Sequence, residues 1–173
     1  PGNTVKKDFE SKLIIKKEQA GFLKTFIQKN KLWVKRPPVA EQLLTIGGEA
    51  EVYINVSDSS VIKINDAVYY ATWLDFFTSL LLHNLLFEET KYQLLGFIMR
   101  DEDLQAVLKQ DYIISDSPVD LNEVKSILEF NGFAHTRRND YFNYELGLIL
   151  EDIHDENVIR NSGFIFFIDT VFY

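Results

Sequence analysis

Apolar residues recur at helical spacing in the first part of the chain. Over residues 8–31 this spacing predicts a helix, and Gly21 falls in its middle. A glycine inside a helix costs about 1 kcal/mol relative to alanine, so we expect one broken helix or two short ones. Pro37 and Pro38 cannot continue a helix and mark its boundary. The apolar positions are Phe9, Leu13, Ala20, Leu23 and Ile27, with Phe22 and Phe26 beside them.

Short apolar runs of strand character follow this boundary. Residues 43–46, 52–56 and 61–64 are rich in β-branched side chains, and Gly47-Gly48 and residues 57–60 separate them. Such runs, bounded by turn residues, predict three antiparallel strands.

The remainder of the chain mixes helices and strands. Residues 71–89 are apolar over a helical length, and residues 94–99 and 105–114 resume strand character. Ser117-Pro118 opens a further helix with acids near its N-terminus and Gly132 as its C-cap. Short strands then occupy 148–150, 158–159 and 166–168. This order of elements predicts an α+β fold.

Composition and charge restrict the classes of protein. The 173 residues are 46% hydrophobic, enough for a core in one domain or two small lobes. The absence of cysteine excludes a disulfide framework and a thiolate zinc site. No apolar run approaches the roughly 20 residues of a membrane helix, and we expect a cytoplasmic protein without membrane contact.

Charge is distributed unevenly. Residues 1–40 hold ten Lys or Arg against three acids, a net +7, which leaves −15 for the rest of the overall −8. The acidic body should repel nucleic-acid phosphates. A DNA-binding basic arm is the alternative, but the segment lacks a dense basic run, so we expect a solvated helix that docks on its own acidic body.

The chemistry concentrates near the end of the chain. Asp152 is followed after four residues by Asn157, and Asp169 comes twelve residues later. Apolar strands frame this loop. The spacing is the one by which kinase-like enzymes carry a catalytic carboxylate and two magnesium ligands, because phosphoryl transfer needs an oriented hydroxyl and neutralised phosphate charge.

Three other interpretations of the acidic residues in this chain stay open. The loop could be a solvated acidic hairpin, since acids and Asn favour turns. His154 with Asp152 and Asp155 could hold a metal, although no second histidine lies nearby. A metal nuclease could use Asp75 with Glu89 and Lys91, but Asp75 falls in a predicted helix.

The order of these parts resembles the protein kinase superfamily. The tail Asp152-x-His154-x-x-Asn157, followed by Ile168-Asp169, is similar to that of aminoglycoside phosphotransferase-like kinases. Residues 23–173 resemble most closely the compact kinase domain of polyvalent proteins from phages and conjugative elements. The matching residues are Trp33, Gly47, Gly48, Val52, Tyr53, Lys63, Asn84 and the tail.

The resemblance implies a fold and a set of ligands. The fold would be protein-kinase-like: a helical extension (1–38), an antiparallel N-terminal lobe with a helix and hinge (39–116), and a reduced C-terminal lobe (117–173). ATP and Mg²⁺ would be the cofactors and an unidentified hydroxyl the acceptor. A degenerate kinase fold that only binds nucleotide or a partner is the alternative. A protein partner or a second copy could complete the short C-terminal lobe.

The resemblance also implies roles for single residues. Asp152 would be the catalytic base, with Asn157 and Asp169 on the metal. Lys63 would contact the α and β phosphates rather than point to solvent from an edge strand, because apolar neighbours make its strand a buried one. The glycine pair Gly47-Gly48 would let the backbone approach phosphate, and the hinge over 107–112, which contains Lys109 and Asp111, would bind adenine through its backbone.

Some positions depart from the family pattern. Glu49 and Glu51 bring negative charge near the phosphates, so they should point away or weaken nucleotide binding. An acid on the helix over 71–89 should pair with Lys63, but the spacing offers His83 or Asn84 before Glu88, so the partner of Lys63 is left unassigned. Leu150-Glu151 replace the His-Arg of protein kinases, and four residues follow Asp169, which makes a peptide substrate doubtful.

Overall fold

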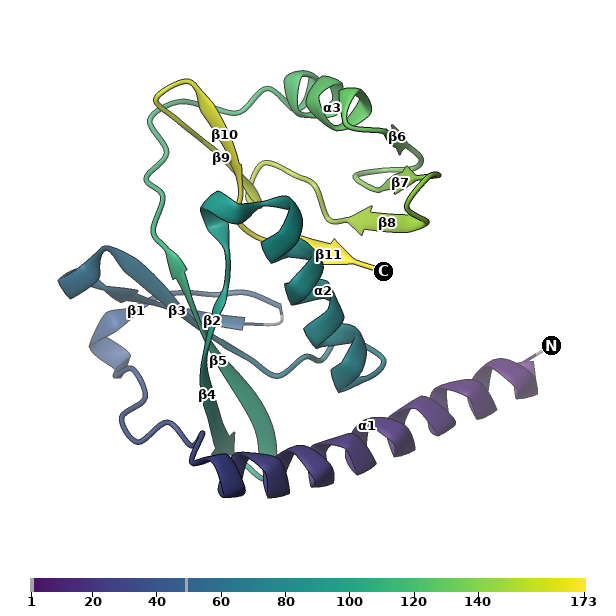
Figure 1. Cartoon of the computed structure of the whole chain (residues 1–173), viewed down its shortest axis with the longest axis vertical. Helices are drawn as coiled ribbons and strands as arrows, with labels where there is room; N and C mark the ends of the chain where they lie inside the picture. Colours follow the sequence, from purple (N-terminus) through teal and green to yellow (C-terminus); the bar gives the residue numbers. More distant parts are fainter. Residues whose placement is uncertain (1, 49) are drawn as a thin grey trace. The chain divides into compact units, whose positions relative to one another are not determined.

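The computed structural model describes the backbone of residues 2–48 and 50–173 and the side chains of residues 12–48 and 50–173. This part of the chain forms three α-helices and antiparallel sheets (Figure 1). The predicted α+β class is therefore confirmed. The chain packs into two compact units: unit 1 comprises residues 1–77 and 92–112, and unit 2 comprises residues 78–91 and 113–173.

Unit 1 is built on a five-stranded antiparallel sheet in the order β1-β2-β3-β5-β4. Its first three strands are the ones that the apolar runs predicted. The turn between β2 and β3 is closed by Ser59 in the left-handed region (φ 53°). The elements are α1 (Gly2–Asn30), η1 (Ala40–Gln42), β1 (Leu43–Ile46), β2 (Ala50–Asn55), η2 (Val56–Asp58), β3 (Ser60–Asn65), β4 (Gln93–Arg100) and β5 (Asp103–Asp111).

Helix α1 is continuous, so the prediction of a broken helix was wrong. Gly21 sits on an open side of the helix, where an added Cβ would meet nothing within 4 Å. The local cost of the glycine is offset by tertiary contacts on either side of it, from Lys16 to the fully buried Ile27. The prediction that this basic segment docks on its own chain is consistent with these contacts.

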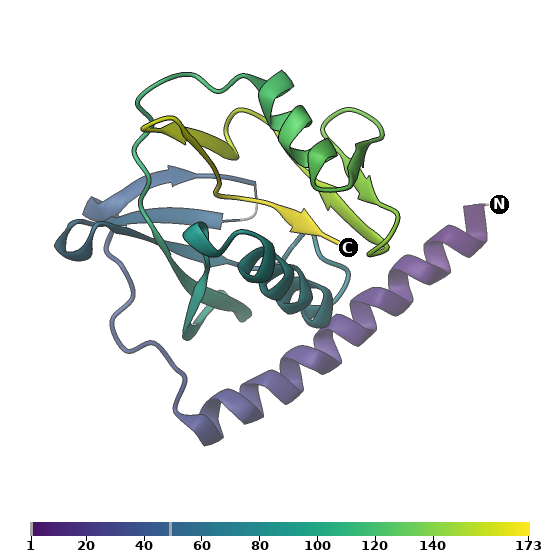
Figure 2. The same ribbon diagram turned by 45° about the horizontal axis from the view of Figure 1, so that its top comes forward.

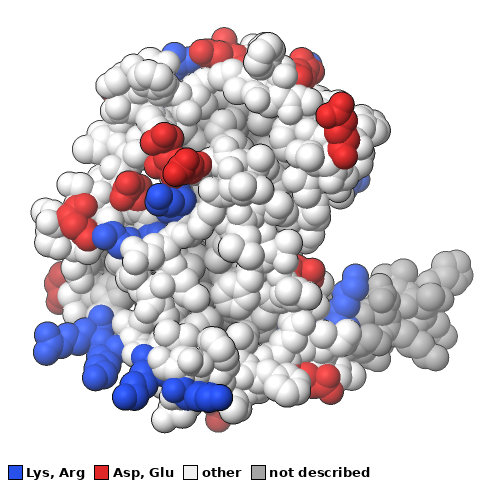
Figure 3. Space-filling view, viewed as in Figure 1, with Lys and Arg blue, Asp and Glu red and all other residues white. Residues whose placement is uncertain are grey.

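The segment after α1 adds to the edge of β4. Val34 N–H donates to the Phe97 carbonyl (2.9 Å) and Phe97 N–H donates to the Leu32 carbonyl (2.9 Å). Gly96 (φ 145°) makes this approach possible, because a Cβ there would lie 2.2 Å from the Leu32 carbonyl oxygen. Figure 3 shows basic side chains gathered over this C-terminal end of α1 and the segment that follows.

Helix α2 (Trp73–Leu86) belongs to both units, with the boundary after Phe77. Its first turns carry the aromatic core of unit 1. Trp73 and Phe76 meet edge to face at 5.6 Å between centroids, and Phe77 meets Phe97 of β4 at 6.1 Å. Such edge-to-face pairs add to the stabilisation that burial of the rings provides.

Unit 2 packs α3 against short antiparallel strands. In both views α3 lies beside β6–β8 (Figures 1 and 2), and its Val124 and Leu128 are buried with Leu150 and Phe172. The elements are η3 (Glu88–Thr90), α3 (Leu121–Phe130), β6 (Phe133–His135), β7 (Tyr141–Asn143), β8 (Leu148–Glu151), β9 (Val158–Asn161), β10 (Phe164–Phe167) and β11 (Val171–Phe172).

The predicted end of α3 is confirmed, whereas the predicted opening at Ser117-Pro118 was wrong, because the helix begins at Leu121. Asp120 is the N-cap and its carboxylate accepts a hydrogen bond from Asn122 N–H (2.8 Å). Gly132 follows the helix with φ 84°. None of the helices within residues 2–48 and 50–173 is long and apolar enough to cross a membrane.

Candidate functional site

Lys63 is a buried lysine in the middle of the unit 1 sheet. Its strand, β3, pairs with β2 on one side and β5 on the other, and 6% of the residue is exposed. The alternative of an edge lysine in solvent is therefore wrong. Its ammonium donates to the Tyr92 hydroxyl (3.2 Å) and lies 5.1 Å from that ring's centroid, so part of the charge is compensated by an aromatic partner.

Glu51 lies on the opposite face of the sheet from Lys63. Lys63 is paired with Val52, and neighbouring residues of a strand point to opposite faces. The Arg100 guanidinium binds the Glu51 carboxylate at 2.6 Å, and with the Tyr53 hydroxyl it holds the pKa of Glu51 below its ordinary value. The Glu51 side chain thus points away from the face that carries Lys63. The prediction for Glu49 lies outside the described residues.

The glycine pair forms the turn between β1 and β2. Gly47 N–H donates to the Ala50 carbonyl (2.8 Å), so this amide is used within the turn. Gly48 lies under the ring of Tyr69: a Cβ at this position would be 2.6 Å from the Tyr69 hydroxyl oxygen. A larger residue at position 48 would have to displace the end of the exposed Tyr69 side chain.

The predicted hinge lies at the end of β5. Lys109 pairs with Gln93 of β4 in the ladder, and its ammonium binds Asp58 at 2.6 Å. Because Lys109 is opposite Ile62, its side chain lies on the other face of the sheet from Lys63. Lys109 therefore offers its side chain to Asp58.

The backbone of Asp111 differs from that of Lys109. Tyr112 N–H donates to the Ser59 carbonyl (2.9 Å), toward β3. The N–H and C=O groups of successive residues in a strand point alternately to its two neighbouring strands, so those of Asp111 point away from β3. On that side the pairing with β4 ends at Lys109. The peptide groups of Asp111 are thus positioned at an unpaired sheet edge.

Residues 152–157 form a compact loop in unit 2, between β8 and β9. Asn157 Nδ2 donates to the carbonyl and to the carboxylate of Asp152, both at 2.9 Å. His154 Nε2 lies 3.2 Å from the Asp152 carboxylate. Asp152 itself adopts a left-handed backbone (φ 68°), which is uncommon outside glycine and turns its side chain out of the strand direction.

The loop is anchored at both ends. Ile153 is buried in the core of unit 2, and its N–H donates to the Asn139 carbonyl (3.1 Å). Ile168 N–H donates to the Asn157 carbonyl (2.9 Å). This bond brings the residue before Asp169 against Asn157, so three of the predicted site residues, Asp152, Asn157 and Asp169, come from one connected backbone region.

A buried polar network lies directly after Asp169. His83 is fully buried, and its Nδ1 lies 2.7 Å from the Thr170 hydroxyl and its Nε2 3.0 Å from the Thr90 carbonyl. Thr90 donates in turn to the Phe167 carbonyl (2.5 Å). The network ties the end of α2 to both sides of Ile168-Asp169.

The donor atoms of this region fit a hard divalent cation. Asn157 uses its amide hydrogens on Asp152, which leaves its Oδ1 as the atom that can bind a cation, and Asp169 supplies a carboxylate. Oxygen donors of this kind suit Mg²⁺. Over the residues with described side chains, no group of three His, Asp or Glu is arranged to hold a metal, which disfavours the site on His154 with Asp152 and Asp155.

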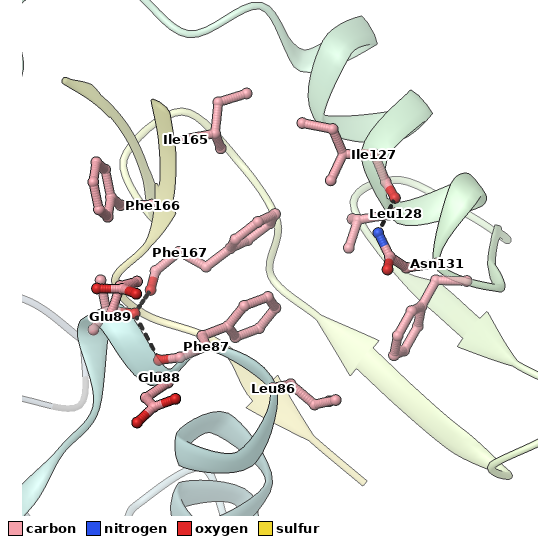
Figure 4. A pocket seen from close by; sticks show the side chains of 12 residues that line it. Leu86, Phe87, Glu88, Glu89, Ile127, Leu128, Asn131, Ile165, Phe166 and Phe167 are labelled. Carbon is pink, nitrogen blue, oxygen red and sulfur yellow. Dashed lines mark hydrogen bonds between the residues drawn. The ribbon is translucent and has the colours of Figure 1, made fainter. Parts of the chain in front are cut away.

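A separate apolar pocket of about 420 Å³ lies within unit 2, between η3, α3 and β10 (Figure 4). Phe87 and Phe167 stack at 4.4 Å in its wall, and Glu88 and Glu89 also line it. Asp152, Asn157 and Asp169 do not line it, so the pocket is distinct from the loop that carries the candidate chemistry.

A second groove of about 340 Å³ is lined by Glu151 and the β6–β7 turn. Burial and the neighbouring Asp140 raise the pKa of Glu151, against the opposing effect of Arg137. Glu151 directly precedes Asp152, so the position before the acidic loop is itself acidic and partly desolvated.

Several residues that shape these regions gave no signal in the sequence. Tyr92 binds Lys63, Tyr69 covers Gly48, and Arg100 neutralises Glu51. Each acts on a residue far away along the chain. The related feature of the composition is that 14% of the residues are aromatic, as Tyr69 and Tyr92 are.

The chain matches a known protein family. A family model described as a serine/threonine/tyrosine kinase found in polyvalent proteins matches residues 16–173. No curated protein and no solved structure matches the chain.

Proposed function

This chain belongs to the family of serine/threonine/tyrosine kinases found in polyvalent proteins, and we propose that it transfers the γ-phosphate of ATP to a hydroxyl acceptor. The observation that carries the proposal is the loop in which Asn157 Nδ2 binds Asp152 and Ile168 N–H binds the Asn157 carbonyl. It joins a carboxylate, an amide and the chain leading to Asp169, which are the groups that phosphoryl transfer requires.

The proposed roles are as follows. Lys63 supplies a cation from the centre of its sheet to the α and β phosphates, and the peptide groups of Asp111 bind adenine. Gly48 lets the backbone approach phosphate. Asn157 Oδ1 and the Asp169 carboxylate hold Mg²⁺, which when bound neutralises phosphate charge. Lys109 contributes through its backbone alone, since its side chain binds Asp58.

The chemical step assigns the proton to Asp152. The acceptor oxygen forms a bond to the γ-phosphorus as the bond to the bridging oxygen breaks, ADP leaves, and the hydroxyl proton passes to the Asp152 carboxylate. The two Asn157 hydrogen bonds and the left-handed backbone orient this carboxylate. In this proposal the lobes of the kinase fold correspond to units 1 and 2, and the protein works in the cytoplasm of a cell that hosts a mobile element.

A non-catalytic binding module is the second candidate. The observation that favours it is the use of Gly47 N–H within its own turn, together with Leu150-Glu151 before Asp152. Both features reduce the groups available for phosphate and for ordering the loop. Such a module would bind nucleotide or a protein partner without turnover.

The two candidates separate in a binding and turnover experiment. ATP should raise the melting temperature of the full chain with Mg²⁺ or Mn²⁺ and not in excess EDTA. Release of γ-phosphate is then measured with water, the protein's own hydroxyls, and a panel of small-molecule and protein acceptors. Binding with turnover supports the kinase, whereas binding without turnover supports the module.

Two substitutions test the assigned roles. Asp152→Asn should leave Mg·ATP affinity nearly intact and lower turnover about 10²- to 10⁴-fold, as for a lost general base. Asp169→Asn should weaken Mg·ATP binding and turnover together, because it removes charge from the metal site. Wild-type turnover equal to that of Asp152→Asn would reject the catalytic role of Asp152.

A further inference from the structure

The loop between β3 and α2 has no regular structure but is held by side-chain hydrogen bonds. Asn65 Oδ1 accepts from Ala67 N–H (2.6 Å) and Asp66 Oδ1 accepts from Val68 N–H (2.9 Å). Ala67 is fully buried and has a left-handed backbone (φ 57°). The two hydrogen bonds and the buried, left-handed Ala67 restrict the backbone conformation of this loop.

Two side chains of helix α1 bind the same loop and the start of α2. Lys16 Nζ donates to the Ala67 carbonyl (2.5 Å) and to the Tyr70 carbonyl (3.1 Å). The Gln19 side chain accepts from Trp73 N–H (2.7 Å) and Leu74 N–H (3.3 Å), and so caps the start of α2.

The contact of Lys16 carries a cost. Desolvation lowers the pKa of Lys16, although Asp66 and Asp103 oppose this effect. A lysine on the surface of a helix normally keeps its ammonium in water. The position of Lys16 is therefore explained by the two carbonyl groups that it binds.

The two carbonyl groups that Lys16 binds bracket Val68 and Tyr69. The Tyr69 ring reaches the glycine turn, where its hydroxyl oxygen would lie 2.6 Å from a Cβ on Gly48 and two ring carbons would lie 3.2 and 3.3 Å away. Yet 63% of Tyr69 is exposed. An exposed hydroxyl donor thus sits beside the backbone that phosphate is proposed to approach.

We propose that Tyr69 is a phosphate-binding residue of the nucleotide site and that Lys16 and Gln19 of α1 position it. This inference rests on the proposed function, since it assigns a further ligand to the same nucleotide. A phosphate oxygen that reaches the backbone of Gly48 meets the Tyr69 hydroxyl at the same place and accepts a hydrogen bond from it. With Gly47 N–H used inside the turn, Tyr69 supplies a donor that the glycine pair lacks.

The test of Tyr69 uses calorimetric titration of the full chain with the non-hydrolysable ATP analogue adenylyl imidodiphosphate in Mg²⁺, and with adenosine. Tyr69→Phe should weaken the analogue about 10- to 100-fold, as for a lost hydrogen bond to a charged group, and leave adenosine affinity unchanged. Tyr144→Phe is the matched control, because Tyr144 is also exposed and lies in unit 2.

The outcomes distinguish this inference from the proposed function. If wild type binds the analogue and Tyr69→Phe binds it equally well, Tyr69 only packs on Gly48 and its role is rejected. If wild type does not bind the analogue, the proposed function fails and the role of Tyr69 fails with it.

The positioning role of α1 is tested with a double-mutant cycle. Lys16→Met and, separately, Gln19→Leu should weaken the analogue about 3- to 10-fold, whereas Lys17→Met, at an exposed neighbouring position, should not. In a Tyr69→Phe background both losses should disappear, because the hydroxyl that they position is gone. A loss of equal size in both backgrounds would reject positioning and leave a structural role only.

Discussion

The glycine turn of unit 1 and the acidic loop of unit 2 are shaped in opposite ways. Residues 152–157 hold their conformation mainly through bonds among themselves, from Asn157 and His154 to Asp152. The glycine turn is covered by Tyr69, whose loop is fixed by Lys16 of α1, 51 residues before Ala67. One region is organised locally and the other by distant parts of the chain.

This difference indicates how each region should respond to substitution. A locally organised loop can lose one side chain with little effect on the rest of the fold. A region organised through tertiary contacts transmits the loss of a contact to residues that the substitution does not touch. The following predictions test that contrast, beginning with the largest effect.

Asn157→Leu should break the acidic loop. It removes both donors to Asp152 and one proposed cation ligand, so kcat should fall about 10²- to 10³-fold. Because the lost bonds lie within the loop, unfolding free energy should fall by no more than about 1.5 kcal/mol. Steady-state kinetics and urea denaturation measure the two effects, and Asp155→Ala, at an exposed position in the same loop, is the control. A kcat within threefold of wild type would contradict the prediction.

His83→Leu should destabilise unit 2 by about 2–3 kcal/mol. The substitution removes the ring partner of the Thr170 hydroxyl and the Thr90 carbonyl in a fully buried site, and buried polar groups that lose a partner are costly. Urea denaturation followed by circular dichroism measures the change. Leu85→Ala, at a position that is 76% exposed on the same helix, should change stability by less than about 0.5 kcal/mol. Equal effects of the two substitutions would show that the network adds nothing.

Asp120→Ala tests a purely local signal. Loss of the N-cap bond to Asn122 N–H should cost about 1 kcal/mol, since the first turn of α3 then has one more unsatisfied donor. The same denaturation experiment measures it, with Glu145→Ala at another exposed acid as the control. No change in the denaturation midpoint would mean that packing of Val124 and Leu128 alone fixes α3.

Glu51→Gln should have the smallest and most pH-dependent effect. Arg100 and Tyr53 lower the folded-state pKa of Glu51 below its ordinary value of 4.5. The carboxylate therefore stabilises the fold above the unfolded-state pKa, and this contribution is lost as pH falls through the folded-state pKa. At pH 7 the variant should be less stable by under about 1 kcal/mol, because the ion pair is partly exposed.

The check is to measure melting curves of wild type and Glu51→Gln from pH 7 down to a pH below the folded-state pKa of Glu51. The two melting temperatures should converge at the acidic end. Glu41→Gln, at an exposed position in unit 1, should show no such trend. A difference that persists unchanged into strong acid would mean that the carboxylate charge is not its source.

Much of the fold was predictable because its signals are local. Apolar runs bounded by turn residues predicted β1, β2 and β3, and Gly132 marked the end of α3, although the helix begins at Leu121 rather than at Ser117-Pro118. The loop that joins Asp152 to Asn157 was predictable for the same reason, since its side-chain bonds to Asp152 connect residues at most five positions apart. The buried position of Lys63 followed from its apolar neighbours.

The sequence by itself thus determined most of the elements, the α+β class and the candidate residues of the acidic loop, because periodicity and short-range hydrogen bonds act between near neighbours. It gave no indication of β6 and β7. Only the tertiary structure decided that α1 continues through Gly21, that Glu51 is neutralised by Arg100, and that Lys63 has Tyr92 as a partner. The same holds for Lys16 on the loop before α2. These contacts join residues that are tens of positions apart, and no local pattern records which distant side chain will fill a given space.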